Sequence, residues 1–98
     1  MSLLIDREKY LIIKDDNSFE LPRKEFETLR LLASIPGKVF SRTQIFEKVW
    51  GEKSSSKERT VDVHILNIRK KLGDELIKTI KGVGYKITIN SIIIKDFI

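Results

Sequence analysis

The residues whose types and spacing suggest chemistry lie in one stretch, ERTVDVHILNIRKKLG, from Glu58 to Gly73. Read as a helix, this stretch has one apolar line suited to rest on a core, formed by Val61, Ile65, Ile68 and Leu72. The opposite face mixes cations, an amide and two large aliphatic side chains: Arg59, Val63, Leu66, Asn67 and Lys70. Arginine and lysine contact guanine edges or phosphates, asparagine pairs with adenine, and aliphatic groups pack on thymine methyls. Such a face suits a helix that reads DNA, but a charged helix face is usually only solvated and single exposed apolar residues are common, so the helix by itself does not decide between the two.

The length, charge and amino-acid composition of the chain restrict the classes of protein to which it can belong. The 98 residues suit one domain, residues 1–98, and the formal net charge of +5 favours a polyanionic partner. The absence of cysteine excludes disulfides, thiolate zinc sites and cysteine nucleophiles, and a single histidine cannot supply a multi-histidine metal cage. We therefore expect no metal site and no cofactor. No apolar run approaches the ~20 residues that span a bilayer, and no secretion signal is recognisable, so the expected location is cytoplasmic.

The first half of the chain reads as strands followed by two helices. Residues 1–21 predict a small sheet, with strands at 3–5, 10–14 and 18–21 and a turn at 15–18. Residues 22–73 predict a three-helix core, in which Pro22 occupies the first turn of a helix that Pro36 and Gly37 end. Ser41 and Gln44 have the spacing of a capping box before the second helix, which Gly51 stops.

The second half of the chain predicts the third helix, at residues 57–72, and then a hairpin at 76–89. The hairpin has strands at 76–80 and 85–89, and the KGVG turn supplies two glycines for positive φ angles. The extra apolar tail, residues 90–98, is also strand-like. It could add a strand, cover a neighbouring surface or mediate self-association.

Three helices followed by a hairpin are the layout of a winged helix-turn-helix, an α+β fold that places its last helix in the major groove of DNA. Thr79, Lys81 and Lys86 flank the glycine turn, where a wing could touch phosphates or enter a minor groove, although a merely solubilised hairpin would look similar. Trp50 is core by default, yet its indole N–H could donate to a phosphate. His64 fits a phosphate contact or an ordinary polar position better than a metal ligand.

The motifs LPRKEFETLRLLASIPGKVFSRTQIFEKVWG, ERTVDVHILNIRKKLG and IKTIKGVGYKI together strongly resemble the C-terminal effector domains of OmpR/PhoB-type response regulators. The resemblance covers residues 21–87. It implies a winged helix-turn-helix with an N-terminal antiparallel sheet, three helices and a C-terminal hairpin wing. It also implies sequence-specific binding of double-stranded promoter DNA, transcriptional regulation in a two-component system, and no enzymatic activity.

The same resemblance assigns roles to individual residues. Third-helix contacts to DNA fall on Arg59, Thr60, Val63, His64, Leu66, Asn67, Arg69 and Lys70. Backbone contacts fall on Trp50, Arg42 and Tyr85, and wing contacts on Thr79 and Lys81. Family members often carry arginine where this chain has Leu66 and Asn67, so a guanine-reading arginine is not expected at either place. Leu66 suggests an apolar contact that suits thymine, and Asn67 suggests adenine.

The resemblance also implies partners: RNA polymerase through the loop 52–57, a phosphorylated receiver domain that this chain does not contain, and a tandem dimer on DNA. We expect the isolated domain to be monomeric or weakly associating. Two rival functions remain open. One is a winged-helix module that binds proteins without specific DNA readout. The other is a fragment of a nucleic-acid-processing enzyme, which would need a carboxylate or metal cluster that the sequence does not display.

Overall fold

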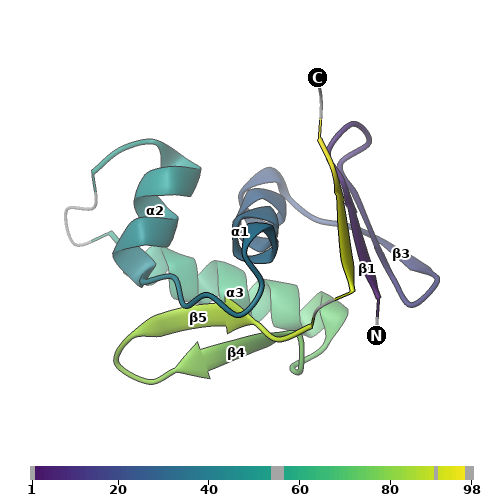
Figure 1. The fold of residues 1–98 in the computed structure, drawn as a ribbon. Coiled ribbons are helices and arrows are strands. Elements are labelled where there is room, and N and C mark those ends of the chain that lie inside the picture. Colours follow the sequence, from purple (N-terminus) through teal and green to yellow (C-terminus); the bar gives the residue numbers. More distant parts are fainter. Residues whose placement is uncertain (1, 54–56, 90, 97–98) are drawn as a thin grey trace.

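The computed structural model describes residues 2–53, 57–89 and 91–96. These residues form three strands, three helices and three further strands, in that order along the chain (Figure 1). Their bounds are β1 Leu3–Asp6, β2 Leu11–Lys14, β3 Asn17–Glu20, α1 Arg23–Ser34, α2 Arg42–Trp50, α3 Arg59–Leu72, β4 Ile77–Ile80, β5 Gly84–Ile87 and β6 Ile92–Lys95. The predicted α+β winged helix-turn-helix is confirmed, and each predicted helix and strand is present with ends that differ by one or two residues.

The N-terminal sheet has four strands in the order β3-β2-β1-β6. Strands β1, β2 and β3 are antiparallel neighbours, as predicted. The apolar tail adds the fourth strand, and it runs parallel to β1, with Leu3 opposite Ile92 and Ile5 opposite Ile94. Ile92 and Ile94 are partly buried against the core, whereas Ile93 between them is 65% exposed. This alternation shows that the tail is half-buried sheet, and it answers the question that the sequence left open.

The helix ends follow local hydrogen bonds. Around α2 the capping box is present, because Ser41 Oγ accepts from the amide of Gln44 and the Gln44 side chain accepts from the amide of Ser41. Pro22 does not lie in the first turn of α1; it is the N-cap, with ψ of 151°. The third helix begins at Arg59 rather than at residue 57, because the amide and the hydroxyl of Thr60 both donate to the carbonyl of Lys57 and form a tighter turn before the helix.

The wing consists of β4 and β5, which pair in an antiparallel hairpin. Of the two glycines in its turn, Gly82 has the positive φ that was predicted, +77°, but Gly84 does not. Gly84 is needed for a different reason: a Cβ there would lie 2.0 Å from the carbonyl oxygen of Phe40. Phe40 and Tyr85 exchange backbone hydrogen bonds of 2.8 and 2.9 Å in an isolated bridge. The start of β5, next to the turn of the wing, is therefore fixed to the segment between α1 and α2 by backbone contact.

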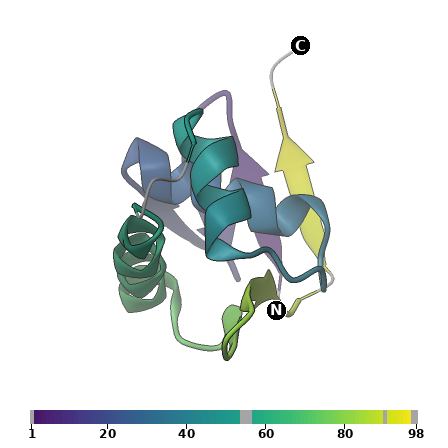
Figure 2. The same ribbon diagram turned by 90° about the vertical axis from the view of Figure 1, so that its left-hand side faces the viewer.

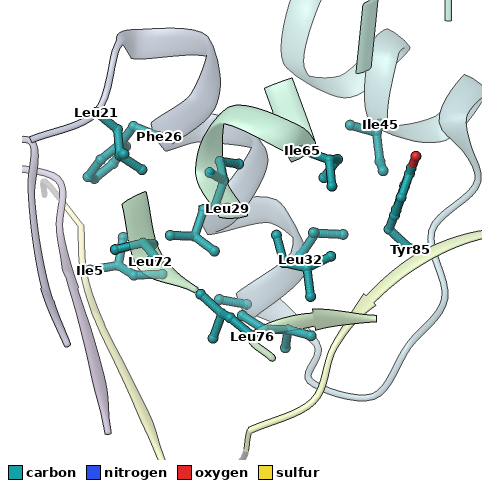
Figure 3. Packing of buried hydrophobic residues seen from close by; sticks show 14 of the residues in the cluster. Ile5, Leu21, Phe26, Leu29, Leu32, Ile45, Ile65, Leu72, Leu76 and Tyr85 are labelled. Atoms are coloured by element: carbon teal, nitrogen blue, oxygen red, sulfur yellow. The ribbon is translucent and has the colours of Figure 1, made fainter. Parts of the chain in front are cut away.

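The core lies where α1 crosses between the sheet, α3 and the hairpin (Figures 1 and 3). The predicted apolar lines of α1 and α3 are fully buried, and each large aliphatic side chain buried there stabilises the fold by about 1.5–3 kcal/mol. Figure 3 shows Leu29 and Leu32 of α1 directed toward Ile65, Leu72 and Leu76. Because α3 is held by this one face, its opposite face is left toward solvent, at the edge of the molecule in Figure 2.

Candidate nucleic-acid interface

The outward line of α3 consists of Arg59, Val63, Leu66 and Lys70, spaced by four, three and four residues. All four are exposed, and the two aliphatic side chains retain 56% and 51% of their accessible surface. They lie opposite the buried line, as the helical period requires. Within the described part of the chain, Arg59 and Lys70 make no side-chain hydrogen bond or ion pair. The outward line therefore presents two solvated cations at the ends of an apolar strip.

On the side of α3 that faces α1 and α2, His64 and Asn67 form what we call the helix-side flank. Both side chains approach one carboxylate oxygen, Oε2 of Glu25 in α1. Asn67 Nδ2 donates to it at 3.1 Å, and His64 Nδ1 lies 3.4 Å from it. Both residues were predicted DNA contacts, and the structure places them half-buried beside the outward line rather than on it.

Trp50, at the end of α2, packs beside the helix-side flank. Its ring stacks on Phe46 at 5.0 Å between centroids and lies 5.2 Å from the His64 ring. Lys24 places its Nζ 5.5 Å from the Trp50 ring centre and donates to the carbonyl of Val49. The tryptophan is half-buried, so it is neither fully in the core nor a free surface group.

On the other side of α3, Asp62 and Arg69 form the wing-side flank. Arg69 Nη2 donates at 2.8 Å to both the carbonyl of Ile77 and the hydroxyl of Thr79, and the guanidinium lies 5.8 Å from the Tyr85 ring centre. Two predicted contacts, Arg69 and Thr79, are thus bonded to each other. They fix the wing to α3.

Asp62 is bonded to the two remaining predicted backbone contacts. Tyr85 donates its hydroxyl to Asp62 Oδ1, and Arg42 Nη1 lies 3.3 Å from Oδ2. Burial, and then the hydrogen bond to Asp62, raise the pKa of Tyr85 to about 12, so the phenol remains a donor at neutral pH. Tyr85 is only 9% exposed, and its position favours organising Asp62 and Arg42 over contacting a phosphate itself. A hollow of about 140 Å³ lies between these residues and the turn of the wing.

Three residues of the surface escaped the sequence-based assignment. Val83, at the tip of the wing, is 57% exposed between the two glycines of the turn, beside the predicted contact Lys81, which is also exposed. Asp62 carries the bonds that connect the wing, α2 and α3. Glu25 could have been found from the sequence, because it falls in the apolar line of α1 with Leu29 and Leu32, where a charged residue is unusual.

The remaining predictions concern Thr60, the loop 52–57, metal binding and membrane-spanning helices. Thr60 uses its hydroxyl in the turn before α3. The predicted polymerase-contacting loop, 52–57, includes residues 54–56, which lie outside the described residues. In the described ranges no three histidine, cysteine, aspartate or glutamate side chains gather in a way that could hold a metal ion. No helix in the same ranges is long and apolar enough to cross a bilayer.

Comparison with known proteins places these features in context. Residues 16–87 match the protein family described as "Transcriptional regulatory protein, C terminal". The heme response regulator HssR of Staphylococcus saprophyticus is 46% identical over 85 residues, which are 82% of this chain and 38% of that protein. HssR of Staphylococcus aureus matches to the same extent. The chain thus spans about 38% of the length of these curated relatives.

Two solved structures extend the similarity to three dimensions. The DNA-binding domain of Bacillus subtilis CssR superposes with a TM-score of 0.79 at 30% identity, covering 89% of this chain and all of that one. The DNA-binding domain of Klebsiella pneumoniae RstA, solved in complex with the RstA box, superposes with a TM-score of 0.80 at 29% identity. That match covers 90% of this chain and 92% of the RstA domain.

Proposed function

The chain belongs to the family of transcriptional regulatory protein C-terminal domains of the OmpR/PhoB type, and on that premise we propose that it binds specific promoter DNA. It acts as the effector domain of a two-component response regulator and regulates transcription. The third helix, α3, enters the major groove. The observation that carries the proposal is the outward line of α3, in which an exposed Val63 and Leu66 are flanked by the free cations Arg59 and Lys70.

The dimensions of the outward line suit the major groove. Arg59 and Lys70 are eleven residues apart, which is about 16 Å along a helix, whereas the groove is about 12 Å wide. Cations at the two ends can therefore reach the phosphates that border the groove, while Val63 and Leu66 lie over the base edges. Such aliphatic contacts favour thymine methyls. Burial of Val63 and Leu66 against DNA also explains why large apolar groups are tolerated where water would otherwise cover them.

The flanks and the wing supply the remaining contacts. Lys81 and Val83 at the wing tip lie near the minor groove, and Arg42 and Trp50 approach the DNA backbone. The wing-side flank acts mainly by holding the wing against α3, because Arg69 donates to Ile77 and Thr79.

The partners follow from the same assignment. In the complete regulator a receiver domain would control the pairing of two effector domains in tandem on repeated half-sites, and the loop 52–57 would contact RNA polymerase. Promoter DNA as the partner implies action in the cytoplasm. Cationic contacts to phosphates release counterions, so affinity should fall steeply with salt.

The test is selection of bound duplexes from a random DNA pool, followed by affinities for the selected and scrambled sequences at two salt concentrations. Recovery of a repeated motif, bound at least a hundredfold more tightly than scrambled DNA, supports the proposal and gives the half-site spacing. Equal affinity for both sequences would contradict specific readout. A folded domain that binds no DNA at low salt would favour the protein-interaction module instead.

A further inference from the structure

Glu25 is a buried carboxylate in the apolar face of α1. It is 4% exposed and shares that face with Phe26, Leu29 and Leu32. Its position in the first turn of α1 is favourable for a negative charge, since the helix dipole is positive there. Burial still costs free energy unless each oxygen has a partner. Oε1 of Glu25 has none among the described residues, so the fold alone does not satisfy this group.

The other oxygen of Glu25 is engaged by the recognition helix. Oε2 accepts from Asn67 Nδ2 at 3.1 Å and lies 3.4 Å from His64 Nδ1, so one atom meets both side chains of the helix-side flank. A carboxylate can only accept, and therefore it determines which end of the Asn67 amide faces it. The amide nitrogen turns toward Glu25, and the carbonyl oxygen Oδ1 turns away from it.

This orientation has a consequence for base recognition. The amide nitrogen of Asn67 carries two hydrogens, so one bond to Glu25 leaves a second hydrogen beside the free Oδ1. Adenine offers an amino group and the N7 acceptor in the major groove, which match an amide oxygen and an amide hydrogen. Without Glu25 the amide could rotate by half a turn and would present the two groups in the reverse order.

The charge of Glu25 argues against a role in affinity. A carboxylate near the DNA surface repels phosphates, and the nearby described side chains, Asn67 and His64, do not neutralise it with a permanent cation. Buried polar groups that are incompletely satisfied concentrate at functional sites. Glu25 lowers the stability of the fold and weakens nonspecific attraction to DNA, so its presence is best explained by its orienting effect on the Asn67 side chain.

We propose that Glu25 is a positioning residue of the DNA-reading surface: it acts through Asn67 to select an adenine within the site. The inference rests on the proposed function, and it assigns one base preference to a pair of residues in two different helices. The same carboxylate oxygen lies 3.4 Å from His64 Nδ1, and the His64 ring lies 5.2 Å from the Trp50 ring.

The experiment measures affinity for selected DNA and for the same DNA with each adenine replaced in turn, using wild type, Glu25→Leu, Asn67→Ala and the double variant. Glu25→Gln keeps an acceptor oxygen, so it should distinguish the selected DNA from the adenine-replaced DNA as well as the wild type does. Glu25→Leu should lose about tenfold in discrimination at one adenine only, with nonspecific affinity unchanged or increased. It should lose nothing further when Asn67 is already alanine, because the two residues act as one unit.

Each contrary result has a distinct meaning. A folded Glu25→Leu domain that keeps full discrimination overturns the inference, as does an equal loss at every base. If Glu25→Leu does not fold, NMR measurement of hydrogen exchange at the side-chain amide of Asn67 in the wild-type domain tests the inference instead. Its hydrogens should exchange more slowly than those of the exposed Asn17, and equal rates overturn the inference. Wild-type protein that binds selected and scrambled DNA alike would overturn the proposed function instead.

Discussion

The hydroxyl of Tyr85 donates a hydrogen bond to Oδ1 of Asp62, which joins the wing to the recognition helix. Arg42 reaches the other oxygen of the same carboxylate from α2. Three elements that approach DNA together in the proposed function, the wing, α2 and α3, therefore meet at one aspartate. The bond stabilises their relative placement, because the tyrosine ring is buried while the aspartate lies at the surface.

Replacing Tyr85 by phenylalanine should remove this bond and preserve the packing of the ring. We expect a loss of about 1–2 kcal/mol in the free energy of unfolding, since the acceptor is charged, together with a loss of DNA affinity. Urea denaturation and binding titrations measure the two effects. Tyr10→Phe is the matched control: Tyr10 donates to Glu27 at 2.7 Å beside the sheet, so it should lower stability without changing DNA binding.

Val63→Ala should weaken binding to selected DNA by about 1 kcal/mol, because the contact with a thymine methyl is lost. Stability should be unchanged, since the side chain is 56% exposed. Replacing thymine by uracil at the contacted position should produce the same loss, and combining the two changes should add little. Ile93→Ala, which alters an exposed aliphatic on β6, serves as the control. A similar loss in that control would mean that the effect is not local to α3.

Arg59→Ala should weaken binding to every sequence alike and reduce the slope of log affinity against log salt by about 1. The reason is that, in the proposed complex, this cation at the end of the outward line contacts a phosphate rather than a base. Lys9→Ala removes another exposed cation, from the turn between β1 and β2, and should leave the slope unchanged. A selective loss on one sequence would assign Arg59 to base readout instead.

Gly84→Ala should destabilise the domain strongly, by about 3 kcal/mol or more, because the new methyl would lie 2.0 Å from a backbone oxygen that cannot move alone. Gly82→Ala meets no atom within 4 Å and suffers only from its φ of +77°, a cost of about 1 kcal/mol. Thermal unfolding of the two variants compares the cost of a steric overlap at Gly84 with the cost of a strained backbone at Gly82. The melting temperature of Gly84→Ala should be the lower of the two, and the reverse order would contradict this explanation.

The tail strand should weaken in acid. Arg30 donates two hydrogen bonds to Asp96, and this pairing holds the pKa of Asp96 below its usual value of 3.8. Stability from the pair is therefore fully present above pH 3.8 and is lost as the pH falls through the lower folded value. Asp96→Asn should cost about 0.5–1 kcal/mol at neutral pH and abolish this acid-dependent part, because both groups are partly solvated. Urea titrations between pH 2 and 6 measure it.

Much of the fold could be predicted because its signals are local. The four-three-four spacing of Val61, Ile65, Ile68 and Leu72 and the capping box at Ser41 depend on neighbours within one or two turns, and the structure bears them out. The parallel pairing of β6 with β1 could not be predicted, because it joins opposite ends of the chain and leaves no periodic trace. Gly84 has the same difficulty, since its close neighbour is Phe40.

The sequence predicts the exposed residues of the outward line well, but it predicts the bonding of the residues in the two flanks poorly. The helical period alone places Arg59, Val63, Leu66 and Lys70 together, and the structure exposes all four. The same period places Asn67 only one position away, yet a carboxylate from α1 holds its amide. Some polar side chains of a helix are already hydrogen-bonded to other elements of the fold. Which ones they are depends on how the elements pack, and the spacing of residues within one helix does not reveal it.

The backbone bridge between Phe40 and Tyr85 has a consequence for how such domains diversify. It anchors the wing through main-chain atoms and one indispensable glycine, whereas the tip residues Lys81 and Val83 contribute nothing to the anchor. Substitutions at Lys81 and Val83 therefore leave the anchoring contacts intact, whereas Gly82 between them is constrained by its positive φ. On the proposed function, the preferred DNA sequence can change through the exposed residues of the tip while the wing stays anchored to the rest of the fold.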